Sequence, residues 1–260
     1  MGTTAQSPEP EAGEIFPLDD RQPFLVHLEE LRRRLLRCFL WMGLGVAAAW
    51  RWAPQLLEIL IRPVGPVVFL SPAEPFLVHL KVAFLGGLGV SFPLLAWEVW
   101  GFLRPALPHQ GRWVVLALLP ASAVLFFTGA WFGWALLLPA ALKILLSFAG
   151  GMTPMLTVGN TIGFAGWLIA GCGLIFQTPL IVFFLAVAGW VRPSTLLRQW
   201  RIAVVAILIT AAVLTPTPDI FTQLLLAGPL AALYLASVLL AFLVSFLSRE
   251  RRSDAAAAES

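Results

Sequence analysis

The feature that most constrains this chain is a series of six long apolar runs, separated by short segments rich in proline, glycine and arginine. An apolar helix of about 20 residues crosses the roughly 30 Å hydrocarbon core of a membrane. A helix also satisfies its own backbone hydrogen bonds, as a membrane span must. The runs therefore predict an all-α, polytopic membrane protein with six transmembrane helices, the last two short. The expected spans cover about 35–52, 75–97, 113–138, 162–187, 202–214 and 220–247.

The composition agrees with a membrane location. Of the 260 residues, 59% are hydrophobic and 12% are charged, whereas a soluble domain carries about 25% charged residues. Residues 1–22 are polar and are predicted to form a disordered cytoplasmic tail, residues 23–250 a single transmembrane domain, and residues 251–260 a second cytoplasmic tail. The two cysteines, Cys38 and Cys172, lie in apolar runs and are expected to be small buried hydrophobic residues rather than a disulfide or a metal pair.

Basic residues gather on one side of the predicted membrane. Six spans place both chain ends on the same side, and that side holds the arginines of both tails and of two connecting loops. The opposite side holds only Arg51, Arg62 and Lys143. Because basic loops remain in the cytoplasm, both termini are predicted to be cytoplasmic, with Asp219 facing outwards.

No catalytic or metal-binding constellation stands out in the sequence. His27, His79 and His109 are separated without metal-ligand spacing, and no phosphate loop or nucleophile elbow is present. A membrane-embedded enzyme would need a paired acid/base or metal set. The alternative of a secondary transporter or channel for a small solute would need several intramembrane charges, whereas Lys81 is the lone charged residue well inside a predicted span.

Residues 24–36 (Phe-Leu-Val-His-Leu-Glu-Glu-Leu-Arg-Arg-Arg-Leu-Leu) form a charged, amphipathic segment that leads into the first apolar run. Leucines recur at steps of three and four residues, which is the periodicity of a helix. Glu29 and Glu30 precede Arg33 and Arg34 by one helical turn and can pair with them. The pattern alone allows either a membrane-entry helix or a binding site for a charged ligand.

Three further local features carry structural expectations. Ser71 and Glu74, with proline in the first turn, predict a helix start. Pro179 interrupts the fourth span and frees backbone carbonyls, which Thr178 or neighbouring spans must satisfy. Small residues at 86–89 and at Gly129 and Gly133 permit close helix packing.

Four motifs, in this order, resemble the TatC family, the multispanning receptor subunit of the twin-arginine protein translocase. They are His-Leu-Glu-Glu-Leu-Arg-Arg-Arg-Leu at 27–35, Ser-Pro-Ala-Glu-Pro-Phe at 71–76 followed by Lys81, Trp-Gly-Phe-Leu-Arg-Pro-Ala-Leu at 100–107, and Leu-Thr-Pro at 214–216 followed by Asp219, Gln223 and Leu224. The resemblance extends over roughly residues 23–252 and implies a curved, glove-like arrangement of the six spans.

The resemblance implies a receptor in the cell membrane of a prokaryote that binds signal peptides bearing two adjacent arginines at the cytoplasmic face. It implies proton-gradient-driven transport of folded proteins together with TatA/TatB-type single-span partners, further copies of this chain and the lipid bilayer, without a cofactor, nucleic acid or enzymatic activity. The signal-peptide-binding residues expected from it are Glu30, Arg32, Phe102, Glu98 and Arg112. The polar residues expected to serve partner docking or structure are Gln177, Pro179, Glu74, Lys81, Asp219 and Gln223.

Two positions depart from the pattern of the family. An acid that the family usually carries in its first loop, as a second acceptor for arginine, is replaced here by Gly111. Either Glu98 substitutes for it, or Glu98 is solvated at the membrane edge and Glu30 acts alone. The fourth span carries Gln177 where the family commonly has an acid. Gln177 either satisfies carbonyls freed by Pro179 or docks a partner.

Overall fold

The computed structural model describes residues 21–104, 111–148, 150, 155–191, 193–215 and 219–258. Side chains are described for 28–104, 116–148, 150, 155–191, 194–215 and 219–242. These parts are almost entirely helical, and the β-structure among them is one isolated bridge between Val68 and Thr157. The predicted all-α fold class is confirmed.

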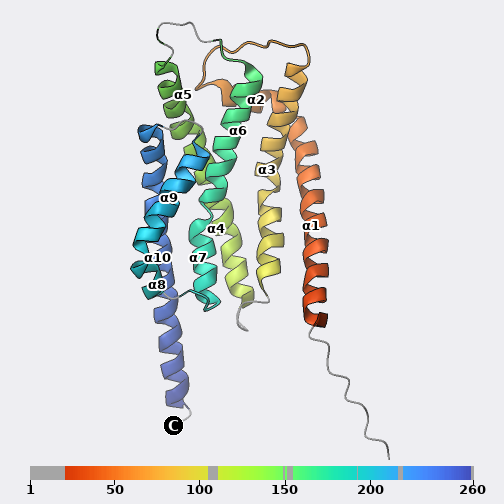
Figure 1. Ribbon diagram of the computed structural model, residues 1–260. Coiled ribbons are helices and arrows are strands. Elements are labelled where there is room, and N and C mark those ends of the chain that lie inside the picture. The colour runs from red at the N-terminus through yellow and green to blue at the C-terminus, as the bar shows by residue number, and fades with distance from the viewer. Residues whose placement is uncertain are drawn as a thin grey trace, which may run out of the picture.

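The helices follow one another as an up-and-down bundle (Figure 1). They are α1 (Arg21–Trp50), α2 (Ala53–Ile61), α3 (Glu74–Leu103), α4 (Gly111–Phe132), α5 (Leu138–Ser147), α6 (Val158–Ile175), α7 (Thr178–Val187), α8 (Pro193–Arg198), α9 (Trp200–Leu214) and α10 (Ile220–Ala258), with the π-helical turn η2 (Gly133–Leu137) between α4 and α5. The start of α1 and the end of α10 lie at the same end of the molecule, and α2 lies at the opposite end (Figure 1).

Four helical stretches are long and apolar enough to cross a membrane: Glu74–Leu103, Leu116–Ser147, Val158–Val187 and Ile220–Phe242. Helix α9 is shorter, with 15 residues. At 1.5 Å per residue it reaches about 22 Å, less than the roughly 30 Å of a hydrocarbon core. The end of α9 and the start of α10 accordingly stop short of the level reached by α5 and α6 (Figure 1). Crossing by α1 and α9, and so the count of six, stays a prediction.

The outer surface of the bundle is apolar. Phe39, Trp131 and Leu239 are 68%, 59% and 69% exposed, and they belong to a large set of exposed aromatic and aliphatic side chains spread over the helices. Water-soluble proteins rarely expose large contiguous apolar surfaces. This surface suits contact with lipid chains.

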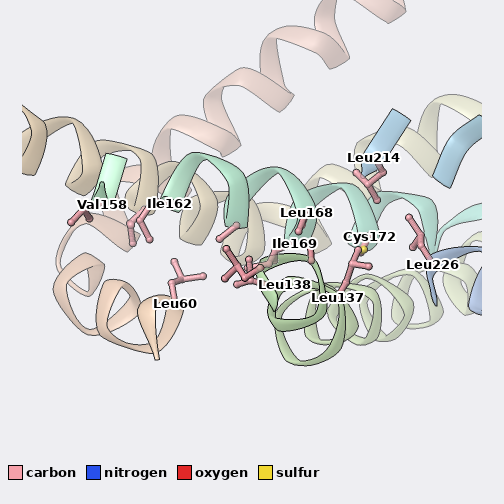
Figure 2. Close-up of a cluster of buried hydrophobic side chains, with 14 of the residues drawn as sticks. Leu60, Leu137, Leu138, Val158, Ile162, Leu168, Ile169, Cys172, Leu214 and Leu226 are labelled. Carbon is pink, nitrogen blue, oxygen red and sulfur yellow. The ribbon is translucent and has the colours of Figure 1, made fainter. Parts of the chain in front are cut away.

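The larger core cluster gathers around α6 (Figure 2). Ile162, Leu168 and Cys172 of this helix are almost completely buried, as are Leu137 and Leu138 at the junction of η2 with α5. Cys172 is thus the small buried residue that was predicted, whereas Cys38 is half-buried, and both thiols are free.

Glycines allow the helices to approach closely at two crossings. A Cβ atom on Gly87 of α3 would lie 2.7 Å from the backbone nitrogen of Val46 on α1, and one on Gly45 would lie 2.6 Å from the Gly87 carbonyl oxygen. A Cβ atom on Gly129 of α4 would lie 2.6 Å from the Cys172 carbonyl oxygen on α6. The expected close packing at these small residues is confirmed.

Helix boundaries differ from the sequence-based expectation in three places. The second span was predicted to end at about residue 97, whereas α3 continues to Leu103 and carries Glu98, Trp100 and Phe102. Helix α1 starts at Arg21, inside the predicted N-terminal tail, whose residues 1–20 lie outside the described ones. Helix α10 continues through residues 251–258, which were predicted as a C-terminal tail.

Candidate functional site

The candidate site lies where the first half of α1 packs beside the last turns of α3. Glu30 and Arg34 are one helical turn apart on α1, and the Arg34 guanidinium grips a single oxygen of Glu30. Arg34 Nε and Nη2 donate to Glu30 Oε1 at 2.9 Å and 2.7 Å. The predicted pairing of Glu30 with Arg34 is confirmed. The exposed pair of Glu29 and Arg33, at 3.7 Å, is the weaker neighbour.

Glu98 reaches across from α3 to the same guanidinium. Arg34 Nη1 lies 3.4 Å from Glu98 Oε2 and donates to the Glu98 backbone oxygen at 3.3 Å. The other carboxylate oxygen of Glu98 lies 3.2 Å from Arg37 Nη1. Glu30 and Glu98, which are 68 positions apart in the sequence, are therefore brought together through Arg34.

The burial of Glu98 depends on this pairing. Its side chain is only 5% exposed, against 33% for Glu30, 19% for Arg34 and 44% for Arg37. An unpaired buried carboxylate is strongly disfavoured, and removing one partner of a buried ion pair is costly. The alternative in which Glu98 is solvated at the membrane edge is therefore wrong.

The four charges of this cluster cancel. Two carboxylates face two guanidiniums, and both Glu98 oxygens have a guanidinium partner. Glu30 uses only Oε1, so among the described residues its Oε2 has no partner. Glu30 thus combines the larger exposure with a vacant acceptor atom, which is what a ligand guanidinium requires.

The remaining residues predicted to bind signal peptides are placed less completely. Arg32 is exposed on α1, and Phe102 is half-buried on α3, one turn beyond Glu98. Arg112 lies in the first turn of α4, but its side chain is outside the described ones. Gly111 begins α4, and the preceding residues 105–110 are not among those described.

Sequence reasoning missed two members of the cluster. Arg37 was treated only as one of the basic residues that mark a membrane side. Its spacing from Glu30 and Arg34, by seven and three residues, places all three on one helical face and could have revealed it. Gly101 was also missed. A Cβ atom there would lie 2.5 Å from Arg34 Nη1, so the glycine leaves space for the guanidinium.

A second polar cluster lies at the opposite end of the bundle, where Glu74 caps helix α6. Glu74 Oε1 accepts from the Gly159 backbone nitrogen at 2.7 Å, and its Oε2 accepts from the Leu70 nitrogen at 2.8 Å. Lys81 Nζ donates to the Gly159 carbonyl oxygen at 2.9 Å. A carboxylate at a helix N-terminus satisfies free backbone N–H groups and suits the helix dipole, so these contacts are structural.

Asp219 and Gln223 stabilise the hairpin of α9 and α10. Asp219 precedes α10 and accepts from the Thr222 backbone nitrogen at 2.7 Å and from the Thr222 hydroxyl, as an N-cap residue does. Gln223 Nε2 donates to the Leu208 carbonyl oxygen on α9 at 3.1 Å. Both contacts are internal to the chain.

The break between α6 and α7 is satisfied within the chain. The Thr178 hydroxyl donates to the Ile175 carbonyl at 2.6 Å, which is the carbonyl that Pro179 leaves free, so the expected role of Thr178 is confirmed. The Gln177 backbone nitrogen bonds Leu174 instead of Gly173. Gln177 Nε2 then donates to the Gly173 oxygen at 3.5 Å and, across to α4, to the Ser122 oxygen at 3.1 Å.

An open apolar groove of about 450 Å³ lies between α1, α3 and α6. It is lined mainly by Met42, Leu80, Phe84, Leu88 and Ile162, with Lys81 among the lining side chains. Among the described residues, no three histidine, cysteine or acidic side chains lie close enough together to hold a metal ion.

Comparison with known proteins matches this chain to the TatC family. Residues 26–229 match the family model described as "Sec-independent protein translocase protein (TatC)". A protein of that name from Koribacter versatilis is 35% identical over 246 residues, covering 91% of each chain. One from Deinococcus radiodurans is 32% identical over 262 residues, covering 95% of this chain and 97% of its own.

A solved structure supports the same family assignment. The crystal structure of the twin-arginine translocase receptor TatC superposes with a TM-score of 0.73 at 32% identity, covering 84% of this chain and 99% of that one. The family match spans most of the chain and includes both α1 and α3, which build the ion-pair cluster. This multispanning membrane protein therefore belongs to the TatC family of Sec-independent protein translocase proteins.

Proposed function

We propose that this chain is the receptor of a twin-arginine translocase and binds signal peptides that carry two adjacent arginines. Membership of the TatC family supports a role in protein transport rather than catalysis. The observation that carries the proposal is the convergence of Glu30 and Glu98, from two helices, on one guanidinium. A site that already holds an arginine of its own chain has the chemistry to hold an arginine of a peptide.

Glu30 is the first acceptor in this proposal. Its Oε2 has no partner among the described residues, and its side chain is one-third exposed. A carboxylate and a guanidinium form two parallel, charge-assisted hydrogen bonds when both oxygens take part. An incoming arginine would therefore take Oε2 first and share the carboxylate with Arg34.

Glu98 is the proposed second acceptor, and it binds a peptide arginine in exchange for an arginine of this chain. Both of its oxygens face guanidiniums, so a peptide arginine must displace one of them. Arg37 is the guanidinium that leaves, because it is 44% exposed and has a single partner, whereas Arg34 is 19% exposed and also holds Glu30. Exchanging one guanidinium for another keeps the buried carboxylate neutralised throughout.

Neighbouring residues complete the proposed peptide site. Phe102 supplies an apolar side chain one turn from Glu98 for the uncharged part of the peptide. Arg32 and Arg112 lie in the stretches around this end and contribute to the basic charge that orients it to the cytoplasmic face of a prokaryotic cell membrane. Both chain ends share this face in the proposed orientation.

Partner subunits are single-span proteins of the TatA and TatB type, with further copies of this chain, and the proton gradient supplies the energy. The groove between α1, α3 and α6 is a candidate surface for a partner helix because it is open and mainly apolar. Gln177 contributes to holding α6 against α4 rather than to this groove, since its amide bonds Ser122.

The test is the dissociation constant of a twin-arginine peptide for the full-length protein in lipid nanodiscs. Glu30→Gln removes a charge-assisted contact worth about 1.5–3 kcal/mol, so affinity falls about ten-fold or more. Glu29→Gln is the matched control, because Glu29 faces only the exposed Arg33, and it leaves affinity unchanged. A peptide with two lysines in place of the arginines should bind more weakly.

Three outcomes would contradict the proposal. A Glu30→Ala variant that exports twin-arginine substrates normally overturns the role of Glu30. Equal losses of peptide affinity in Glu29→Gln and Glu30→Gln indicate a nonspecific effect of charge. Unchanged binding in Glu98→Gln removes Glu98 from the acceptor site and leaves Glu30 as the acceptor of this pair.

A further inference from the structure

A pocket lined mainly by residues with polar side chains lies in the elbow between α8 and α9. These two helices meet at the same end of the molecule as the start of α1 and the end of α10 (Figure 1). The volume of the pocket is about 570 Å³, and the lining residues are Ser194, Thr195, Arg198, Gln199, Arg201 and Ile202. This elbow pocket forms because the chain turns at Gln199, whose backbone nitrogen bonds the Thr195 oxygen at 3.0 Å while its own oxygen accepts from Ile202 at 2.9 Å.

A hydrogen bond from helix α10 fixes the position of α8 at the elbow. The Tyr234 hydroxyl on α10 donates to the Leu196 carbonyl oxygen on α8 at 2.6 Å. Gln199 also donates from its backbone to this carbonyl, at 3.2 Å. Leu196 thus ties the short helix to the elbow and to α10, so that the pocket keeps a defined shape.

The residues whose side chains are described around the pocket do not neutralise its positive charge. No acidic residue occurs in the sequence between Glu98 and Asp219. Among the described residues, the side chains of Arg198 and Arg201 have no ion pair or hydrogen bond, and Arg201 lies over the Trp200 ring at 5.7 Å. The hydroxyls of Ser194 and Thr195 and the Gln199 amide are likewise without hydrogen-bond partners in the described part of the chain.

The available donors suit a phosphate group. A guanidinium group can donate two parallel hydrogen bonds to two oxygens of a phosphate. Hydroxyl and amide groups can add neutral hydrogen bonds. Helix α9, with 15 residues, begins beside Gln199, so the dipole at its N-terminus also favours an anion there. These features reinforce one another at a single place.

The surroundings select a lipid phosphate. Trp200 and Ile202 are 55% and 65% exposed, and Trp190, which closely follows the end of α7, is 70% exposed. Exposed tryptophans mark the level of lipid headgroups, and basic pockets between membrane helices bind anionic headgroups. A phosphodiester in the pocket could therefore keep its acyl chains against the apolar surface that starts at Ile202.

We propose that the elbow pocket binds the phosphodiester headgroup of an anionic lipid, with Arg198 and Arg201 as the principal ligands. The site is separate from the ion-pair cluster on α1 and α3 and does not depend on the proposed peptide binding. A bound lipid would fix the start of α9 at the membrane surface.

The test uses full-length protein in detergent with equal amounts of phosphatidylglycerol and phosphatidylcholine, and native mass spectrometry to count retained lipids. The wild-type protein should retain phosphatidylglycerol preferentially. The double variant Arg198→Gln/Arg201→Gln should lower this retention about ten-fold. The matched control Arg33→Gln/Arg104→Gln removes two exposed arginines at the same end of the bundle and should retain the lipid.

A charge-neutral variant separates the pocket from bulk charge. Thr195→Val/Gln199→Leu removes a hydroxyl and an amide and should lower retention several-fold while both arginines remain. Three results would each overturn the proposal. The two arginine double variants could lose phosphatidylglycerol equally, or the wild-type protein could retain both lipids equally. Thr195→Val/Gln199→Leu could also leave the retention of phosphatidylglycerol unchanged. Complete displacement of phosphatidylglycerol by inorganic phosphate would assign the site to free phosphate and overturn the lipid assignment.

Discussion

Arg34 on α1 and Glu98 on α3 form an ion pair across the bundle, with Nη1 and Oε2 3.4 Å apart and side chains 19% and 5% exposed. The same guanidinium holds Glu30 one turn earlier on α1. Arg34 therefore joins the two helices and shares both carboxylates that are proposed to receive the peptide arginines.

Replacing Glu98 should destabilise the protein more than replacing an exposed acid. Glu98→Gln leaves Arg34 and Arg37 without their shared counter-charge and lowers the free energy of unfolding by about 1–3 kcal/mol. Thermal unfolding in detergent measures the difference. Glu29→Gln is the control, because its pair with Arg33 is about three-quarters exposed and such pairs contribute about 0–1 kcal/mol. Equal midpoints in the two variants would contradict a structural role for Glu98.

An acid at position 111 should strengthen peptide binding. The present cluster is neutral, whereas the resemblance to the family predicts an acceptor near the start of α4. Gly111→Glu adds a negative charge in the first turn of that helix, which the helix dipole favours. We expect several-fold tighter binding of a twin-arginine peptide at low salt, with a smaller gain at high salt. Titration at two salt concentrations checks this, and Gly111→Gln serves as the uncharged control.

Glu74 should control the order of the α6 N-terminus. Glu74→Leu removes both carboxylate acceptors, so the amide hydrogens of Leu70 and Gly159 should exchange with solvent faster than in the wild type. Hydrogen–deuterium exchange of peptides covering 66–72 and 156–164 measures this. Glu58→Leu, at an exposed acid on α2 that pairs with Arg62, should leave both peptides unchanged. An unchanged exchange rate at the Gly159 amide in Glu74→Leu would rule out Glu74 as the cap of α6.

Gln177→Leu tests whether the amide is structural. The variant leaves the carbonyls of Ser122 and Gly173 without this donor and should lower the free energy of unfolding by about 1–2 kcal/mol. Co-purification of TatA- or TatB-type partners should be retained. Loss of the partner with an unchanged unfolding midpoint would instead assign Gln177 to docking.

The crossing of α1 over α3 should be intolerant of side chains at Gly87. A Cβ atom there would meet the Val46 backbone at 2.7 Å, so Gly87→Val must push the helices apart. Overpacking of this kind costs about 1–3 kcal/mol, and the unfolding midpoint should fall. Gly43→Ala, at a position with open space around it, should be neutral and is the control.

The sequence predicted helices well because each apolar run imposes one secondary structure in a membrane. Proline positions likewise predicted the break at Gln177 and Thr178. The end of α3 was missed because the second span was predicted to stop at about residue 97, before Glu98 and Trp100. Both are tolerated at buried positions of α3 by partners distant in sequence. Glu98 pairs with Arg34 and Arg37, and the Trp100 ring nitrogen donates to the Ser122 hydroxyl at 2.8 Å.

The candidate site was only partly predictable for the same reason. Glu30 and its partner Arg34 lie one turn apart, so their pairing follows from helix geometry alone. The convergence with Glu98 depends on how α1 crosses α3, and that crossing depends on glycines packed against backbone. A pattern read along one helix contains no information on which residue of another helix it will meet.

The pairing of Glu98 with two arginines, Arg34 and Arg37, has an evolutionary consequence. A lineage that replaces this acid with a neutral residue leaves two guanidiniums crowded at one helix crossing, so substitutions at positions 34 and 37 should accompany it. A lineage that gains an acid near position 111 could lose the one at 98 more easily, because another carboxylate would be close to the same helix ends. Positions 34, 37, 98 and 111 should therefore covary among relatives as a single inherited unit.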